Sequence, residues 1–280
     1  MIKLILYKIF TFLIFLKSPK YLINKDIFGL KYFIWKDTRP LDTFVRGVRV
    51  DDTSLIFFVI KLVNYFNKKK YKKYYFDVGS FIGIITLTFS KYGKNCNIHS
   101  FEPFQVSYLR QKINLSINKC NNVTLNNFAI SDKNEKLLLK QNILNPGMNF
   151  LKKQNKKFKY ENKTSVQANT LDNYLEMKKI KSIDILKIDA EGFDLNVLYG
   201  CRNLIKKQSI KVIFIEFLFN NKESKKIKNF LNKNNYEIFY LVRNNNTIVS
   251  SQKKYPKDSQ SLLNAIALPL NSELKKILIN

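Results

Sequence analysis

Three ionisable residues alternate in one short stretch of the sequence, "LKIDAEG" (residues 186–192). Lys187, Asp189 and Glu191 are two positions apart, so in an extended backbone their side chains would point to the same side. Asp189 could then accept a proton from a hydroxyl, with its pKa raised by desolvation and by Glu191. Alternatively, Asp189 and Glu191 could both hold Mg²⁺, a hard cation that prefers oxygen ligands and lowers the pKa of a bound hydroxyl.

The same stretch also has a purely structural interpretation. Asp189 could cap the next helix, while Lys187 lies along the strand with its head in solvent. Spacing alone favours neither interpretation. Glu216, near the end of "VIFIEF", is a further catalytic candidate, because an acid at another strand end could hydrogen-bond the reacting group.

A second stretch, "YYFDVGSFIG" (residues 74–83), predicts a turn that binds a small molecule. Strand-forming aromatics run into Asp77, Gly79 and Gly83, and glycine lets the backbone approach a ligand closely. The G-x-G-x-x-G pattern that holds a pyrophosphate is absent. Asp77 could instead attract an ammonium group, while loop N–H groups attract a carboxylate. S-adenosylmethionine (SAM) carries both groups.

Glu102 ends the next predicted strand, in "IHSFEPF", 19 residues after Gly83. An acid at about this spacing binds ribose hydroxyls in nucleotide-binding α/β folds. Glu102 could instead cap the helix that follows. Together, the glycine loop and this acid favour a bound nucleoside.

The ends of strands must position all these candidates. From Tyr74 onward, apolar strand patterns alternate with helical patterns, which is typical of a parallel α/β sheet. Ligands bind at the carboxyl ends of such strands. We predict strands near residues 74–78, 97–101, 123–128, 183–188, 211–217, 236–242 and 264–269, and helices over 82–92, 104–118, 196–206 and 223–232.

The sequence has no internal repeat or flexible linker. We therefore predict an N-terminal helical appendage over residues 1–70 and one catalytic domain over residues 71–280. Within the domain, "KNEKLLLKQ" (residues 133–141) could add a strand, and the basic stretch over residues 145–160 predicts a loop that could cover the site.

Residues 1–17 carry an apolar run, Ile9 to Leu16, that is flanked by lysines. The run is too short to cross a bilayer, which needs about 20 residues. It could form a helix that lies peripherally on the inner face of the membrane, near anionic headgroups. The alternative is a helix packed on the catalytic domain.

The chain is strongly basic, with a formal net charge of +28. Only six of its 49 basic residues are arginines, whose bidentate fork usually recognises phosphates and bases. We therefore expect most lysines to lie on solvated surfaces and expect no nucleic-acid partner. The three cysteines match no metal spacing and suit a reducing cytoplasm. His99, the only histidine, could serve as a base, but a half-buried strand residue is the favoured interpretation.

Six stretches, in order, carry a resemblance to a known family: "YFDVGSFIGIITLTFS", "IHSFEPF", "NNFAISD", "TLDNYL", "IDILKIDAEGFDLNVLYG" and "IFIEF". They resemble the FkbM family of SAM-dependent methyltransferases, over about residues 48–268. The resemblance implies a class I methyltransferase fold, an α/β architecture with a seven-stranded, mostly parallel sheet and helices on both faces. It also implies transfer of a methyl group from SAM to a hydroxyl of a saccharide or saccharide-bearing metabolite.

The resemblance further assigns the cofactor site. It places Asp77, Gly79 and Gly83 in the cofactor loop, Glu102 at the ribose, and the backbone of Phe128 and Ala129 near adenine.

The loop also departs from the family pattern D-V-G-A-N-x-G. Ser80 and Phe81 stand where Ala and Asn are usual. We expect Ser80 to replace part of the lost amide contact to the cofactor.

Two other functions are compatible with these features. The net charge would suit an RNA methyltransferase, although scarce arginine argues against it. Phe81 and the N-terminal run would suit a membrane-associated binding protein that keeps the fold without turnover.

Overall fold

The computed structural model describes residues 21–25, 29–35, 53–140, 150–153, 163–219, 221–242, 247–250 and 263–279. Residues 1–17 lie outside these ranges, so their contact with a membrane stays a prediction. None of the helices in the described ranges is long and apolar enough to cross a membrane.

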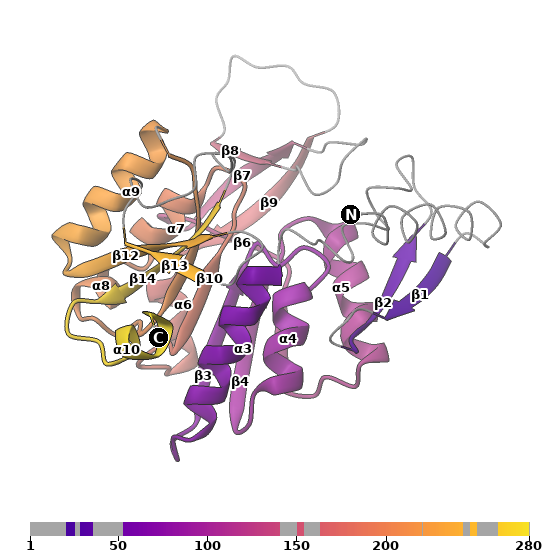
Figure 1. Cartoon of the computed structure of the whole chain (residues 1–280). Coiled ribbons are helices and arrows are strands. Elements are labelled where there is room, and N and C mark those ends of the chain that lie inside the picture. Colours follow the sequence, from indigo (N-terminus) through magenta and orange to yellow (C-terminus); the bar gives the residue numbers. More distant parts are fainter. Residues whose placement is uncertain are drawn as a thin grey trace, which may run out of the picture.

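An eight-stranded sheet forms the centre of the fold (Figure 1). In spatial order its strands are β13 (Thr247–Val249), β12 (Tyr236–Val242), β14 (Leu263–Pro269), β11 (Ile213–Phe217), β10 (Ile185–Ile188), β3 (Lys73–Val78), β4 (Cys96–Phe101) and β5 (Val123–Asn126). Strands β11, β10, β3, β4 and β5 are parallel, whereas β14 is antiparallel to both its neighbours. The seven predicted strands are confirmed, and β13 adds an eighth at the edge.

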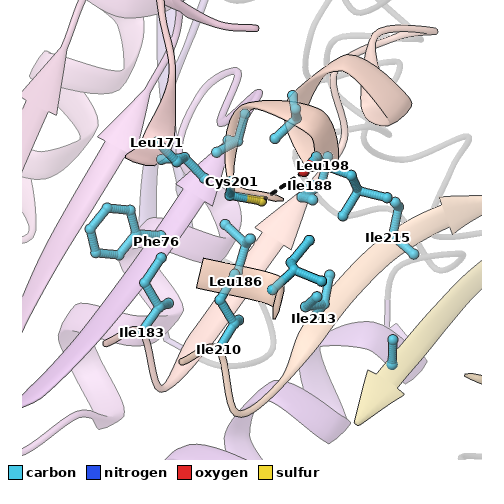
Figure 2. Close-up of a cluster of buried hydrophobic side chains, with 14 of the residues drawn as sticks. Phe76, Leu171, Ile183, Leu186, Ile188, Leu198, Cys201, Ile210, Ile213 and Ile215 are labelled. Carbon is cyan, nitrogen blue, oxygen red and sulfur yellow. Dashed lines mark hydrogen bonds between the residues drawn. The ribbon is translucent and has the colours of Figure 1, made fainter. Parts of the chain in front are cut away.

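Four helices cover one face of the sheet: α6 (Leu171–Lys178), α7 (Asp194–Gly200), α8 (Arg202–Lys206) and α9 (Lys222–Lys233). Figure 2 shows part of the core between these helices and the sheet, where Cys201 lies with Leu171 and Leu198 of the helices and with Leu186 and Ile188 of β10. The prediction of a single helix over residues 196–206 is wrong, because two helices, α7 and α8, cover this range. The backbone leaves helical geometry at Cys201 (φ −121°, ψ 26°) and separates α7 from α8.

The opposite face is covered by α3 (Thr53–Asn67), α4 (Ile84–Tyr92) and α10 (Leu274–Ile279), with α5 (Gln105–Ile117) beside α4 (Figure 1). Helix α3 falls within the range that we expected to be an appendage. Its buried residues, such as Phe58 and Leu62, share one core with Tyr75 and Phe214 of the sheet. A domain boundary at residue 70 would cut through this core, so α3 belongs with the sheet.

A hairpin of β1 (Tyr21–Lys25) and β2 (Lys31–Trp35) lies against α5 (Figure 1). The side-chain amide of Asn118 accepts from the main-chain N–H of Lys31 at 2.9 Å and donates to its carbonyl. Tyr32 is buried in a small core with Leu115. The hairpin is therefore fixed to the end of α5.

A second sheet of four strands has the order β6 (Ala129–Ile130), β9 (Lys163–Asn169), β7 (Glu135–Lys140) and β8 (Phe150–Lys153). Strand β7 confirms the extra strand predicted over residues 133–141. Strand β8 corrects the prediction of a continuous loop over residues 145–160, because it supplies main-chain partners to β7. The rest of that loop lies outside the described residues, so its covering of the site stays a prediction.

Candidate functional site

The loop after β3 comes into close contact with the end of β10. Gly79 has φ +71°, and a Cβ there would lie 1.7 Å from the main-chain oxygen of Asp189. Gly83 has φ +93°, and its Cβ would lie 2.8 Å from Cγ of Gln111. Only glycine combines a left-handed backbone with such close approach. The predicted cofactor loop and the predicted catalytic stretch are therefore neighbours.

Glu102 holds this loop from β4. One carboxylate oxygen accepts from the main-chain N–H of Phe81 at 2.8 Å, and the other accepts from the N–H of Phe104, just before α5, also at 2.8 Å. Burial raises the pKa of Glu102 to about 7. Both the loop and the start of the helix thus depend on one acid. Each oxygen keeps a lone pair with which it can accept a further hydroxyl hydrogen bond.

Asp77 is fully buried at the end of β3. Its Oδ2 accepts from the hydroxyl of Thr86 at 2.6 Å, and its Oδ1 lies 3.4 Å from Nζ of Lys187. The carboxylate therefore faces the protein interior, and attraction of a ligand's ammonium by Asp77 stays a prediction.

The ammonium of Lys187 joins the loop to the acids. Its Nζ donates to the carbonyl of Gly79 at 2.9 Å and lies 3.3 Å from Oδ2 of Asp189. Burial lowers the pKa of Lys187, but Asp189 and Asp77 outweigh this effect and raise it above its ordinary value. Lys187 is therefore a buried cation, which corrects the structural interpretation that placed its head in solvent.

The backbone beyond Asp189 does not stay extended. Strand β10 ends at Ile188, and Glu191 (φ +48°) and Gly192 (φ +86°) both have left-handed backbones. Glu191 is exposed, and Asp189 is half-buried. The expected convergence holds for Lys187 and Asp189. For Glu191 it stays a prediction, because the turn ends the two-residue alternation on which it rested.

Asp194 is a residue that the sequence reasoning missed. It lies buried in the first turn of α7, and its Oδ1 accepts from the main-chain N–H of Ala190 at 3.0 Å. The residue at the N-cap of α7 is Phe193, not Asp189, and Asp194 ties the first turn of the helix to Ala190. Burial raises the pKa of Asp194 to about 6. An acid in the first turn after a glycine was the signal that could have identified it.

Glu216 lies on β11 and is influenced by the charges of the acids around the end of β10. Burial, followed by the charges of Asp189, Asp194 and Glu191, raises the pKa of Glu216 to about 9. This shift favours the neutral form of the carboxyl, which can donate a hydrogen bond. Within the described ranges, no group of three or more His, Cys, Asp or Glu side chains could hold a metal ion. The expected Mg²⁺ site thus finds no support there.

The side chain of Ser80 points toward helix α5. Its hydroxyl donates to Oε1 of Gln111 at 2.7 Å, and its side chain is buried. A contact between this side chain and the cofactor, which we expected, gains no support from this orientation. Gln111 itself had no signal in the sequence.

His99 is a core residue. Its ring stacks on Phe76 with centroids 4.8 Å apart, and its Nδ1 lies 2.9 Å from the hydroxyl of Tyr174. Burial, helped by Lys178, lowers the pKa of His99 to about 4. The structural interpretation is supported, with the ring fully rather than half buried.

Phe128 and Ala129 connect the two sheets. The Phe128 ring packs edge-on against Phe101 at 5.5 Å, and Ala129 is buried at the start of β6. They follow β5 at the same end of the sheet as Glu102. Their expected place near adenine stays a prediction.

Comparison with known proteins identifies related sequences and folds. A family model described as "Methyltransferase FkbM domain" matches residues 77–238, which is more than half of the chain. The METTL16 MTase domain is 12% identical, with a TM-score of 0.50, over 95% of this chain and 92% of that one.

A second solved structure shares the fold. A SAM-dependent methyltransferase from Agrobacterium tumefaciens is 6% identical, with a TM-score of 0.50, over 90% of this chain and 71% of that one. At these identities the likeness shows the fold alone. None of the curated proteins matches this chain in sequence.

Proposed function

Because the chain belongs to the FkbM family of methyltransferases, and is thus a SAM-dependent methyltransferase, we propose that it methylates a hydroxyl of a saccharide or saccharide-bearing metabolite. The observation that carries this proposal is the contact between Gly79 and Asp189. It brings a half-buried carboxylate directly beside the cofactor loop. The resemblance to the family supplies the class of acceptor.

The residues of the loop fit the cofactor. Gly79 and Gly83 let the loop turn through left-handed backbones, and the Glu102 oxygens can each accept one further hydrogen bond. We assign ribose binding to Glu102, and binding of the methionine end and the adenine to loop N–H groups and the backbone of Phe128 and Ala129. When bound, SAM would supply a methyl group on a sulfonium sulfur, from which a neutral thioether is a good leaving group.

The protein's own part in the reaction is positioning and proton acceptance. Holding two reactants in line is worth effective molarities of about 10⁵ to 10⁸ M. Asp189 accepts the acceptor's hydroxyl proton, which typically adds about 10²- to 10⁴-fold. Lys187 fixes that carboxylate through its ion pair at 3.3 Å. Glu216, as a neutral acid, donates a hydrogen bond to the acceptor.

We propose that the enzyme works in the cytoplasm, and that residues 1–17 place it against the inner face of the membrane. The apolar run and its flanking lysines support this contact.

Calorimetry with SAM and its demethylated product tests the cofactor. Both should bind with comparable affinity, because Glu102 and the loop would contact parts common to the two. Heat with NAD, and none with either SAM or its product at about 1 mM, would contradict the assignment.

Transfer of a labelled methyl group tests the acceptor. The label should enter a saccharide fraction and be absent from RNA. Label in one RNA at physiological salt would instead favour the RNA methyltransferase that the net charge of +28 suggests.

A further inference from the structure

Helix α5 turns polar side chains toward the protein interior. Ser107, Gln111 and Asn114 are almost fully buried, whereas Val106 and Leu109 on the same helix are exposed. Burying an amide costs free energy unless it is hydrogen-bonded. The buried polar side chains of α5 must therefore have hydrogen-bond partners inside the protein.

Gln111 is the centre of these hydrogen bonds. Its amide nitrogen donates to the hydroxyls of Ser100 at 2.6 Å and Thr86 at 3.0 Å. Its amide oxygen accepts from Ser80 at 2.7 Å. Both amide hydrogens and one oxygen lone pair are thus used, which fixes the orientation of the amide.

A continuous chain of contacts leads from Gln111 to the catalytic carboxylate. The Thr86 hydroxyl donates a hydrogen bond to Oδ2 of Asp77 at 2.6 Å. The other oxygen of Asp77 faces Nζ of Lys187 at 3.4 Å, and that ammonium lies 3.3 Å from Asp189. Every link except Asp189 is buried, so water does not replace a lost partner.

Gln111 also fills the space beside the second glycine. Gly83 is the N-cap residue of α4. A Cβ on Gly83 would lie only 2.8 Å from Cγ of Gln111. Gln111 therefore supports the loop by packing as well as by hydrogen bonds to Ser80 and Thr86.

We propose that Gln111 is a positioning residue, which holds the cofactor loop and, through Thr86, Asp77 and Lys187, the carboxylate of Asp189 in one arrangement. The inference rests on the proposed function, because it assumes that this loop binds SAM. A network of buried hydrogen bonds is rigid when complete and loses that rigidity when one member is removed. Gln111 thus acts on catalysis without touching cofactor or acceptor.

The test is a cycle of variants in the full chain, with SAM and its demethylated product as calorimetric probes. Gln111→Met keeps the length of the side chain and removes its polar atoms, and Thr86→Val breaks the next link. Each should weaken SAM binding about tenfold. The double variant should bind no more weakly than the weaker single variant, because both break one chain of contacts.

Leu115→Ala is the matched control. Leu115 lies one turn further along α5 and is buried among apolar side chains. Its truncation loosens the helix without touching the network, so SAM affinity should stay close to that of wild type. If Gln111→Met does not fold, Ser80→Ala removes a single link and should weaken binding about threefold.

Activity gives a second readout. At saturating SAM, the methyl-transfer rate of Gln111→Met should stay about tenfold below wild type, because Asp189 is no longer fixed. A merely structural role would restore the rate at saturation.

Four results would overturn the inference alone: normal SAM affinity in both Gln111→Met and Ser80→Ala, strictly multiplicative effects in the double variant, full activity at saturating SAM, or an equal loss of affinity in Leu115→Ala. A wild type that binds neither probe overturns the proposed function, and this inference with it.

Discussion

The main-chain oxygen of Asp189 occupies the space in which any side chain of Gly79 would lie, at 1.7 Å from the position of its Cβ. The cofactor loop and the end of β10 are thus packed backbone against backbone. The ammonium of Lys187 closes the contact by donating to the Gly79 carbonyl at 2.9 Å.

Gly79→Ala should therefore destabilise the protein by about 2 kcal/mol or more, since it adds a backbone clash to a strained left-handed residue. Gly192→Ala is the control, because Gly192 has a similar φ of +86° but no atom within 4 Å of its Cβ position. It should cost only about 1 to 2 kcal/mol, from backbone strain alone. Urea unfolding measures both, and equal losses would contradict the importance of the contact.

Phe81→Asn should stabilise the protein by about 0.5 kcal/mol. Phe81 has a left-handed backbone (φ +49°), which asparagine adopts at lower cost than an aromatic residue. Phe81→Leu should bring no gain, because leucine keeps the strain. Thermal unfolding distinguishes the two variants. A loss of stability in the Asn variant would show that packing of the ring outweighs the strain.

The stability of the SAM-free protein should fall as pH rises from about 5 to 7, through Glu102. Its pKa in the folded state is about 7, against an ordinary value of 4.5. Between these values the folded state holds a proton that the unfolded state has released, so a rise in pH favours unfolding. One fully buried group contributes on the order of 2 to 3 kcal/mol over this range.

Glu102→Gln should reduce this slope, because the amide does not titrate. Its stability should be lower than that of wild type at pH 5, since one of the two main-chain N–H groups loses its acceptor. Urea unfolding at several pH values provides the comparison. Parallel curves for the two proteins would show that Glu102 is not the group responsible.

Asp189→Asn should leave the dissociation constant for SAM within a few-fold of wild type and lower turnover by about 10²-fold or more. Asparagine keeps the shape of the side chain and loses its charge. Calorimetry and labelled-methyl transfer measure the two effects. Near-normal turnover would exclude Asp189 as the base and make Glu216 the next residue to test.

Addition of EDTA to the wild type then separates two roles of Asp189. Activity that is lost and restored by Mg²⁺ would indicate a metal ligand. Activity that is indifferent to EDTA would indicate direct proton acceptance.

The strands could be predicted because the residue types within each strand indicate that it is buried. Strand β12 has the predicted bounds, Tyr236–Val242, and β3 differs by one residue at its start. A run of aromatic and β-branched residues buried on both faces needs no long-range information. The loop glycines were found for the same reason, since their conformation is a local property.

Gln111 could not be predicted, because its role depends on three partners from three other segments. Nothing within α5 distinguishes a glutamine that faces a buried threonine from one that faces water. The place of Glu191 could not be predicted for a different reason. The alternation rule assumes an extended backbone, and the turn at Glu191 and Gly192 ends it. The break at Cys201 did have a local signal, because Gly200 directly precedes it and ends α7.

Strand β14 lies between β11 and β12 although it follows both in the chain. During synthesis, β11 and β12 therefore leave the ribosome before the strand that joins them exists. The nascent chain must keep the edge of β11 unpaired until residues 263–269 emerge, and an unpaired apolar edge invites association with other chains. Chaperone dependence of this protein should accordingly be greatest in the interval before β14 is made.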